Sequence, residues 1–309
     1  MRFFDFHCDT PFAMETRGQA LTENDCHVSL KKAEVYESYG QVMAIWSQKS
    51  LSSEEAWERF FVIRDDLISK LPEEKAAICT TCAQYRAALA KGKSPFFLAV
   101  EDARLLCGRY ERLETLYRCG VRFLTPVWRD ESCIGGAFNT EAGLTDFGRD
   151  AVRGALALGM VIDLSHASDI MMEEILAMAR EAGRPVVATH SNSRAVCNHK
   201  RNLTDGVARA IAETGGVFGI NMVPFHLSED SVADARSVYR HILHFLSLGL
   251  EDAVCFGCDL DGMDVTPEGI RNVGDILTIA DALRAHGVSE TVIEKIFFKN
   301  ADRFLQRVF

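Results

Sequence analysis

Short apolar runs alternate with helix-like segments along the whole chain, and this order limits the possible folds more than any other feature of the sequence. We expect eight strands, most of them followed by a helix, at residues 1–10, 41–46, 96–101, 121–125, 160–164, 185–189, 217–220 and 253–257. The later runs are continuously apolar, which is typical of strands buried on both faces of a parallel sheet. Eight such units in 309 residues predict an α/β fold, a (β/α)8 TIM barrel, with a doubly wound sheet as the alternative.

The segments between the strands carry ordinary signals for helix ends. We expect helices at residues 52–70, 82–90, 103–118, 145–158, 168–181, 205–214, 231–248, 271–285, 289–298 and 300–308. Ser52 begins a capping box, Thr145 and Ser168 are suited to cap their helices, and Gly159 can end one. No linker or low-complexity segment interrupts the pattern, so we expect residues 1–309 to form a single domain.

The overall composition argues against several classes of function. A formal charge of −10 and an isoelectric point near 5.4 disfavour nucleic acid or an anionic membrane surface as a partner. No run approaches the roughly 18 apolar residues of a membrane span, and the first residues enter a strand at once, so we expect a soluble chain without a signal peptide. The ten cysteines have no framework spacing, which favours reduced thiols and a cytoplasmic protein.

The first apolar run ends in a pattern that suits a metal ion. In a regular strand Phe4, Phe6 and Cys8 would share one face, while Asp5, His7 and Asp9 would share the other. Positions two apart on one face are separated by roughly 6–7 Å. The imidazole and the carboxylate can therefore converge on one divalent cation such as zinc. A lone His-x-Asp more often marks an ordinary strand end, so a metal site here requires further ligands elsewhere in the chain.

Further polar residues stand at the ends of four other expected strands. In a barrel the carboxyl ends of the strands form the active-site face, so these side chains should meet. Separately, each has an ordinary explanation, such as a helix cap or a hydrogen-bonded buried histidine. Together they predict a metal site, because coordination removes the cost of buried charge. The full set comprises His7, Asp9, Glu101, His166, His190 and Asp259.

The number of candidate ligands exceeds what one closed zinc site needs. We therefore expect two metal ions that share a carboxylate, with Glu101 as the bridge and a hydroxide held between the ions. Asp259 would then be free to orient this hydroxide and carry its proton to the leaving group.

At these residues the sequence resembles the membrane dipeptidase (renal dipeptidase) family of zinc metallopeptidases, which are amidohydrolase-like barrels. The resemblance covers nearly the whole chain and is carried by residues 5–9, 100–101, 143–148, 159–166, 189–191, 197–203 and 257–262. It implies a zinc-dependent dipeptidase with a binuclear centre and a bridging hydroxide. The implied substrate is a dipeptide or a dipeptide-like small molecule.

The resemblance also implies a role for each site residue. Asp259 would be the catalytic acid/base, and Arg201 would hold the substrate carboxylate through the two parallel bonds of a guanidinium fork. The implied zinc ligands are His7 and Asp9 for one ion, His166 and His190 for the other, and Glu101 as the bridge between them.

Two positions depart from the family pattern on the substrate side. Trp128 stands where members often carry a histidine that contacts the substrate carbonyl, and Val223 replaces a tyrosine of the seventh-strand motif. We expect Trp128 to contribute to a substrate pocket that is narrower and more apolar than that of a histidine-bearing relative. Among the remaining histidines, only His226 is kept as a site candidate, and His199 is suited to the layer around the site.

Two alternatives stay open. The first is another amidohydrolase-type reaction, such as lactone, amide or phosphoester hydrolysis. Many barrels of that kind bridge their metals with a modified lysine on the fourth strand, and residues 122–128 contain no lysine. The second is a non-catalytic metal-binding barrel, which the complete set of six polar residues disfavours. A homodimer is one open oligomeric state.

Overall fold

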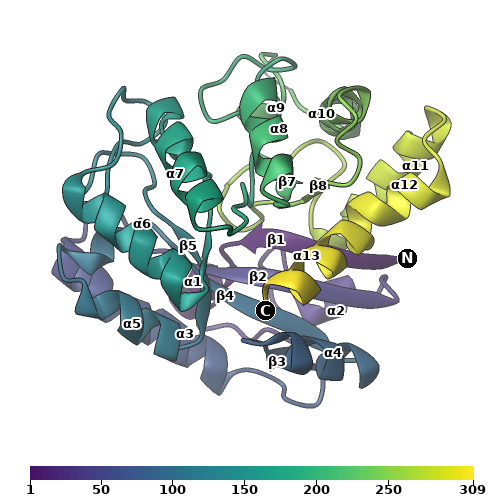
Figure 1. Ribbon diagram of the computed structural model, residues 1–309. Helices are drawn as coiled ribbons and strands as arrows, with labels where there is room; N and C mark the ends of the chain where they lie inside the picture. Colours follow the sequence, from purple (N-terminus) through teal and green to yellow (C-terminus); the bar gives the residue numbers. More distant parts are fainter. Residues whose placement is uncertain (231) are drawn as a thin grey trace.

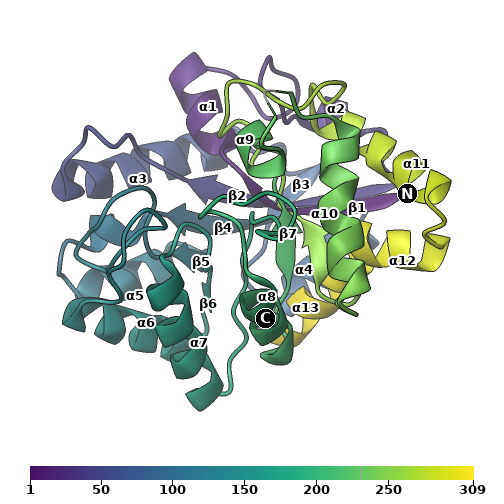
Figure 2. The ribbon, with the colours of Figure 1, turned by 90° about the horizontal axis from the view of Figure 1, so that it is seen from above.

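A curved parallel sheet surrounded by helices forms the centre of the computed structural model, which describes residues 1–230 and 232–309. Figures 1 and 2 show the strands in the interior and the helices around them. The strand order is β6-β5-β4-β2-β1-β8-β7, with β3 beside β4, and every pairing is parallel. The strands are β1 (Arg2–Cys8), β2 (Ser38–Ile45), β3 (Ala76–Ile78), β4 (Ser94–Glu101), β5 (Val121–Thr125), β6 (Val161–Ile162), β7 (Phe218–Ile220) and β8 (Val254–Phe256).

Seven of the eight expected strands are present, and one expected strand is reduced to two bridges. Residues 185–189 do not form a regular strand. Instead Asp163 pairs with Val187, and Ala188 pairs with Phe218, both in parallel. This segment therefore lies between the end of β6 and β7, where the expected strand would have been. The short strand β3 was not expected, because its three residues are too few to show a periodicity.

The helices agree with the expected ones in place, with several differences at their ends. Those that follow the prediction are α3 (Ser53–Ser69), α4 (Cys82–Ala90), α6 (Asp146–Leu158), α7 (Asp169–Glu181), α8 (Asp205–Glu213), α10 (Ala235–Ser247), α12 (Glu290–Glu294) and α13 (Asn300–Val308). Between α12 and α13 the chain continues through the π-helical turn η3 (Lys295–Lys299). Residue 231, the first of the expected helix 231–248, lies outside the described residues.

The expected helix 103–118 is divided into η1 (Ala103–Leu106) and α5 (Glu111–Arg118). Cys107 and Gly108 have φ values of 51° and 70°, which a right-handed helix cannot contain. The expected helix 271–285 likewise consists of η2 (Val273–Ile276) and α11 (Leu277–Ala285). Three helices were missed in polar or Pro-containing stretches, namely α1 (Thr10–Arg17), α2 (Leu30–Ala33) and α9 (Pro224–Leu227).

Helix ends follow the local chemistry of the sequence. The hydroxyl of Ser52 accepts a hydrogen bond from the backbone N–H of Glu55, and the Glu55 carboxylate accepts one from Ser52, which completes the capping box. Thr145 and Ser168 cap α6 and α7 through their hydroxyl oxygens. Gly159 ends α6 in the left-handed conformation, with φ of 85°. These four signals were correctly identified in the sequence.

A bulge in β1 changes which of its side chains face the site. The pairing of β1 with β2 shifts register between Asp5 and Cys8. Phe4 and Phe6 therefore pack in one apolar cluster, while Cys8 packs in the other. The expected strict alternation, with Cys8 on the face of the two phenylalanines, is wrong for this reason. Bulges commonly re-aim side chains next to active sites, and here the bulge lies at His7.

The core lies on both faces of the sheet. On β4, Phe97 and Ala99 share a face with Glu101, and they belong to the cluster of Phe4 and Phe6. The larger cluster joins the opposite face of the sheet to the surrounding helices. Helix α13, near the C-terminal end of the chain, packs against β1, the first strand (Figure 1). Within the described part of the chain, no helix is long and apolar enough to cross a lipid bilayer.

Candidate metal centre

The six predicted metal-site residues meet at one edge of the sheet, and all of them are buried. They come from five segments that are far apart in the sequence. His7 lies near the end of β1 and Asp9 follows this strand, Glu101 ends β4, His166 follows β6, His190 follows the 187–188 segment, and Asp259 follows β8. Parallel strands place their carboxyl ends at the same edge, which explains why these residues converge.

Glu101 lies at the centre of this group. One carboxylate oxygen, Oε2, lies 3.3 Å from His7 Nε2. The other oxygen, Oε1, lies 2.9 Å from His166 Nε2 and 3.7 Å from His190 Nε2. The two oxygens of one carboxylate therefore face two different groups of histidines. This is the arrangement that a carboxylate shared by two cations requires.

The remaining distances define a group on each side of Glu101. On one side His7 Nε2 lies 3.6 Å from Asp9 Oδ2 and 4.0 Å from Asp259 Oδ1. On the other side the Nε2 atoms of His166 and His190 are 2.9 Å apart. The trio His7, Asp9 and Asp259 and the trio Glu101, His166 and His190 each bring three donor atoms within 4.8 Å of one another.

The donor atoms of the site fit a cation better than they fit one another. His7 Nε2 and Asp9 Oδ1 are buried and have no hydrogen-bond partner within the described chain. Unpaired buried polar atoms are costly, and a divalent ion would satisfy several of them at once. Imidazole nitrogens and carboxylate oxygens are also the ligands that zinc and similar ions accept. The residues present therefore fit a metal centre.

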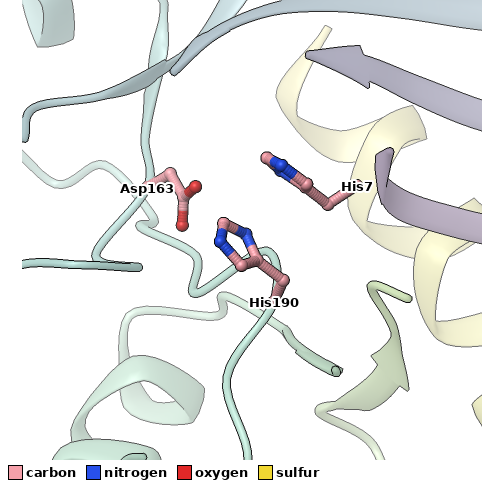
Figure 3. A group of neighbouring side chains, drawn as sticks. All are labelled: His7, Asp163 and His190. Atoms are coloured by element: carbon pink, nitrogen blue, oxygen red, sulfur yellow. The ribbon is translucent and has the colours of Figure 1, made fainter. Parts of the chain in front are cut away.

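A third group, His7, Asp163 and His190, lies beneath this layer, and its side chains point toward one another in Figure 3. The Thr189 hydroxyl links them. It donates to Asp163 Oδ2 at 2.6 Å and lies 2.8 Å from His190 Nδ1. It also lies 3.4 Å from His7 Nδ1. Because the hydroxyl proton goes to Asp163, its lone pairs accept from His190 Nδ1–H, which leaves the Nε2 lone pair free for a metal.

Asp163 supports the site from below, because its acceptor capacity is used within the protein. Its carboxylate also accepts hydrogen bonds from Thr125 Oγ1 at 2.7 Å and from the backbone N–H groups of Ser165 and Thr189 at 3.0 and 2.8 Å. A carboxylate with four donors has little capacity left for a cation. We therefore interpret Asp163 as the residue that orients the histidine rings through Thr189.

The pKa values of the histidines follow from burial and from neighbouring charges. Burial lowers the pKa of His166 to about 4, assisted by the charge of Arg201. Burial also lowers the pKa of His190 well below its usual range. Both rings are therefore neutral near pH 7, which is the state that binds metal. For His7, burial is outweighed by the charges of Glu101 and Asp9, which raise its pKa.

Asp259 stands across the site in a strained position. Its backbone φ is 59°, a conformation uncommon outside glycine, and its N–H donates to His7 O at 3.0 Å. Asn221 Nδ2 donates to Asp259 Oδ2 at 3.0 Å. Burial raises the pKa of Asp259 to about 6, partly opposed by the charge of His7. A carboxyl group that titrates close to neutral pH is suited to transfer protons.

Arg201 is a buried guanidinium that lacks an acidic partner in the described part of the chain. Its side chain is 2% exposed, and its Nε atom has no hydrogen-bond partner. The other nitrogens make only long contacts, 3.4 Å to Ser191 Oγ and 3.3 Å to His190 O. A buried cation with no carboxylate in contact indicates a place for an anion from outside the chain.

A cavity of about 740 Å³ opens onto these residues. Asp9, Glu101, His166, Arg201 and Asp259 contribute to its wall. Trp128 and Val223, the two positions that depart from the family pattern, also line it. The Trp128 ring packs edge-on against Trp46 at 5.1 Å, and its centroid lies 6.3 Å from that of His166. The structure therefore places Trp128 beside the candidate metal centre, in the wall of the cavity.

Several site residues had no assigned role in the sequence prediction. Asp163, Thr189 and Asn221 support the histidines and Asp259 from below. The signal for Asp163 was present, because a carboxylate inside the apolar run 160–164 needs a buried partner. His226, which was kept as a candidate, lines the cavity, and so do His199 and Arg129.

The loop after β8 is fixed by Asp261. Its carboxylate accepts hydrogen bonds from Thr10 Oγ1 and from the backbone N–H of His27, both at 2.6 Å. In return the N–H of Asp261 donates to His27 Nδ1 at 3.0 Å. These contacts give His27, which was not kept as a site candidate, a structural role. They tie the loop before α2 to the segment that carries Asp259.

The fold and the site together define a metal-dependent hydrolase with an amidohydrolase-like α/β fold and a buried cluster of histidines and carboxylates. The chain belongs to the membrane dipeptidase family (peptidase family M19), whose sequence model matches residues 1–308. It is therefore a metal-dependent dipeptidase. The family favours this function over the two alternatives, another amidohydrolase-type reaction and a non-catalytic metal-binding barrel.

Three similar proteins illustrate this relationship. An uncharacterized protein of the pqqA 5′ region of Klebsiella pneumoniae is 34% identical over 221 residues, which are 68% of this chain and 80% of that protein. The crystal structure of dipeptidase AC, a family M19 metallopeptidase, is 26% identical, with a TM-score of 0.91 over 100% of this chain and 98% of that one. A Rhodobacter sphaeroides metallopeptidase, liganded with a phosphinate mimic of L-Ala-D-Ala, shares the fold at 24% identity, with a TM-score of 0.90 over 100% and 99% of the two chains.

Proposed function

We propose that this chain hydrolyses dipeptides with a centre of two zinc ions. The observation that carries the proposal is the position of Glu101, whose two oxygens face separate groups of histidines. His7 and Asp9 would hold one ion, His166 and His190 the other, and Glu101 would bind both. When bound, the ions would act as Lewis acids on the peptide carbonyl and lower the pKa of the attacking water.

Asp259 would carry the proton of the reaction. It lies within 4.0 Å of His7 and is oriented by Asn221. As a carboxylate it would take a proton from the attacking water, and as the acid it would give this proton to the leaving amine. Its pKa near 6 allows both states at neutral pH. Thr189 and Asp163 would keep the histidine rings in the orientation that directs Nε2 toward the metals.

Arg201 would hold the carboxyl terminus of the dipeptide. Its guanidinium is buried and lines the cavity without an acidic partner in the described chain. A carboxylate accepts two parallel bonds from such a fork, whereas a longer peptide would offer a neutral amide at the same place. This supports a substrate with a free C-terminal carboxylate two residues long. The ligand of the Rhodobacter sphaeroides metallopeptidase is a mimic of L-Ala-D-Ala. We therefore include dipeptides with a D-configured second residue among the proposed substrates.

The fold and setting of the enzyme are proposed on separate grounds. The bridges of residues 187 and 188 to the neighbouring segments support closure of the sheet into a (β/α)8 barrel, formed by one domain. All ten cysteines are free, which supports a reducing compartment such as the cytoplasm. The homodimer remains a prediction that a mass measurement in solution can test.

Two measurements test the proposed function. Metal analysis of protein never exposed to chelator should find close to two zinc ions per chain. A substrate panel should show hydrolysis of dipeptides, with L- and D-configured second residues, and no comparable turnover of lactones or phosphoesters. His190→Ala should lose a metal ion and activity together, whereas His286→Ala, at an exposed histidine outside the cavity, should lose neither. A protein that binds no divalent metal would refute the proposal.

A further inference from the structure

His226 is a buried histidine in the cavity wall that the proposed mechanism does not use. Its side chain is 7% exposed and lines the cavity, and its ring nitrogens make no hydrogen bond within the described part of the chain. Its backbone is firmly held, because its carbonyl accepts hydrogen bonds from Asn202 Nδ2 at 2.8 Å and from Asn192 Nδ2 at 3.5 Å. The ring packs between His199 and Phe225, and its polar atoms remain free for a ligand.

His199 and Arg201 adjoin His226 on the same wall. The rings of His199 and His226 have centroids 4.7 Å apart. His199 Nδ1 accepts a hydrogen bond from the backbone N–H of Arg201 at 3.2 Å, so the ring carries its proton on Nε2 and can act as a donor. Asn202, which anchors His226, directly follows Arg201 in the chain. One network thus holds a guanidinium and two imidazoles together.

Arg129 adds a second guanidinium at the rim of the cavity. Its Cζ atom lies 4.8 Å from the centroid of the Trp128 ring. The neighbouring Asp130 is paired with Lys49 at 2.5 Å, and Arg129 itself has no ion pair among the described residues. Burial lowers the pKa of both Arg201 and His226, and the positive charge of Arg129 lowers each of them further. The more distant carboxylates of Asp259, Glu101 and Asp163 act on Arg201 in the opposite direction. This wall therefore carries two guanidiniums that form no ion pair among the described residues, beside two imidazoles that can donate hydrogen bonds.

We propose that this basic wall is a specificity subsite for dipeptides whose C-terminal residue carries a side-chain carboxylate, of the aspartate or glutamate type. The inference rests on the proposed dipeptidase function. Arg201 takes the α-carboxylate, and His226 and Arg129 recognise the carboxylate of the side chain. One α-carboxylate can balance only one of the two guanidiniums. The wall thus has room and charge for a second anion, and the acidic side of the cavity, which includes Asp264, is left for the ammonium group.

The test compares substrates that differ only in this charge. Ala-Asp is compared with Ala-Asn, and Ala-Glu with Ala-Gln, each with an L- and a D-configured second residue. We expect the acidic member of each active pair to have a kcat/KM higher by about tenfold or more, which is the range for a hydrogen bond to a charged group. The difference should lie mainly in KM, because this contact is present before the chemical step.

Two variants test whether Arg129 and His226 cause the preference for an acidic C-terminal residue. Arg129→Gln and His226→Phe should each reduce the ratio of kcat/KM for Ala-Asp over Ala-Asn severalfold. Phenylalanine keeps a flat ring between His199 and Phe225, and Arg129 is exposed, so its variant carries little risk to folding. The matched controls Arg153→Gln and His286→Phe, at exposed residues that do not line the cavity, should keep the ratio of the unmodified enzyme.

The outcomes separate this inference from the proposed function. An enzyme that cleaves Ala-Asp and Ala-Asn equally well would overturn the inference and leave the dipeptidase proposal intact. A preference for Ala-Asp that survives in both variants would also overturn it, because the preference would then arise elsewhere. An enzyme inactive on every dipeptide would refute both. Loss of the preference in both variants, with the controls unchanged, is the result that we expect.

Discussion

Removing the hydroxyl of Thr189 tests whether the layer beneath the metal centre has the role that we assign to it. Thr189→Val keeps the shape of the side chain but loses the contacts of 2.6 Å to Asp163 and 2.8 Å to His190. The His190 N–H then has no acceptor in a buried site. Loss of such a partner typically weakens metal binding by about 10–100-fold, which corresponds to about 1.4–2.7 kcal/mol. An unpaired buried group also costs about 1–3 kcal/mol of folding stability.

Zinc affinity measured by chelator competition, together with the free energy of unfolding of the apo-protein, reports both effects. Thr189→Ser is the matched control, because it restores the hydroxyl in a smaller side chain, and we expect its zinc affinity to stay near that of the unmodified protein. If Thr189→Val bound zinc as tightly as Thr189→Ser, the hydroxyl would not orient the histidines. Asp163 would then have to be reconsidered as a ligand.

Four further changes have defined outcomes. Asp259→Asn should keep its metal content but lose about 10²–10⁴-fold in turnover, the usual value of a general acid/base; loss of the metals instead would make Asp259 a ligand. Arg201→Lys should raise KM more than it lowers kcat, because a point charge replaces a fork, and equal activity on C-terminally amidated dipeptides would remove this role. Trp128→Phe should lower turnover and Trp128→His preserve it if the indole N–H reaches the substrate, whereas unchanged kinetics and substrate preference in both would place Trp128 outside the site. Finally, burial lowers the pKa of His241 from 6.5 to about 4, a shift worth about 3 kcal/mol of folding stability. This stability is present above pH 6.5 and is lost as the pH falls toward 4, because the unfolded chain takes up the proton more readily. His241→Gln should therefore flatten the pH dependence of the free energy of unfolding between pH 6.5 and 4.

The residues at the strand ends could be predicted because two simple rules apply to them. A buried parallel strand reads as an apolar run, and its carboxyl end lies at the functional edge of the sheet. Glu101 ends such a run, and His166 and Asp259 each follow one closely. The sequence was therefore enough to predict that these three residues lie near one another. The helix caps at Ser52 and Thr145 could also be predicted, because a cap depends on residues only a few positions apart.

Features that depend on contacts between distant segments could not be predicted. The bulge at His7 arises from the pairing of β1 with β2, and the residue types within β1 do not indicate it. The contact of Asp261 with Thr10 and His27 joins positions more than 230 residues apart. The same holds for His226, whose orientation depends on the two asparagines that hold its carbonyl. Its sequence position after an expected strand was the only signal available.

The central claim is that Glu101 joins two metal sites in one dipeptidase, and titration of the apo-protein tests it most directly. Zinc would be added in measured equivalents to the metal-free chain while hydrolysis of an active dipeptide is followed. The account predicts that activity rises with added zinc and reaches its maximum at two equivalents per chain. A maximum at one equivalent, or no hydrolysis at any amount of zinc, would contradict it.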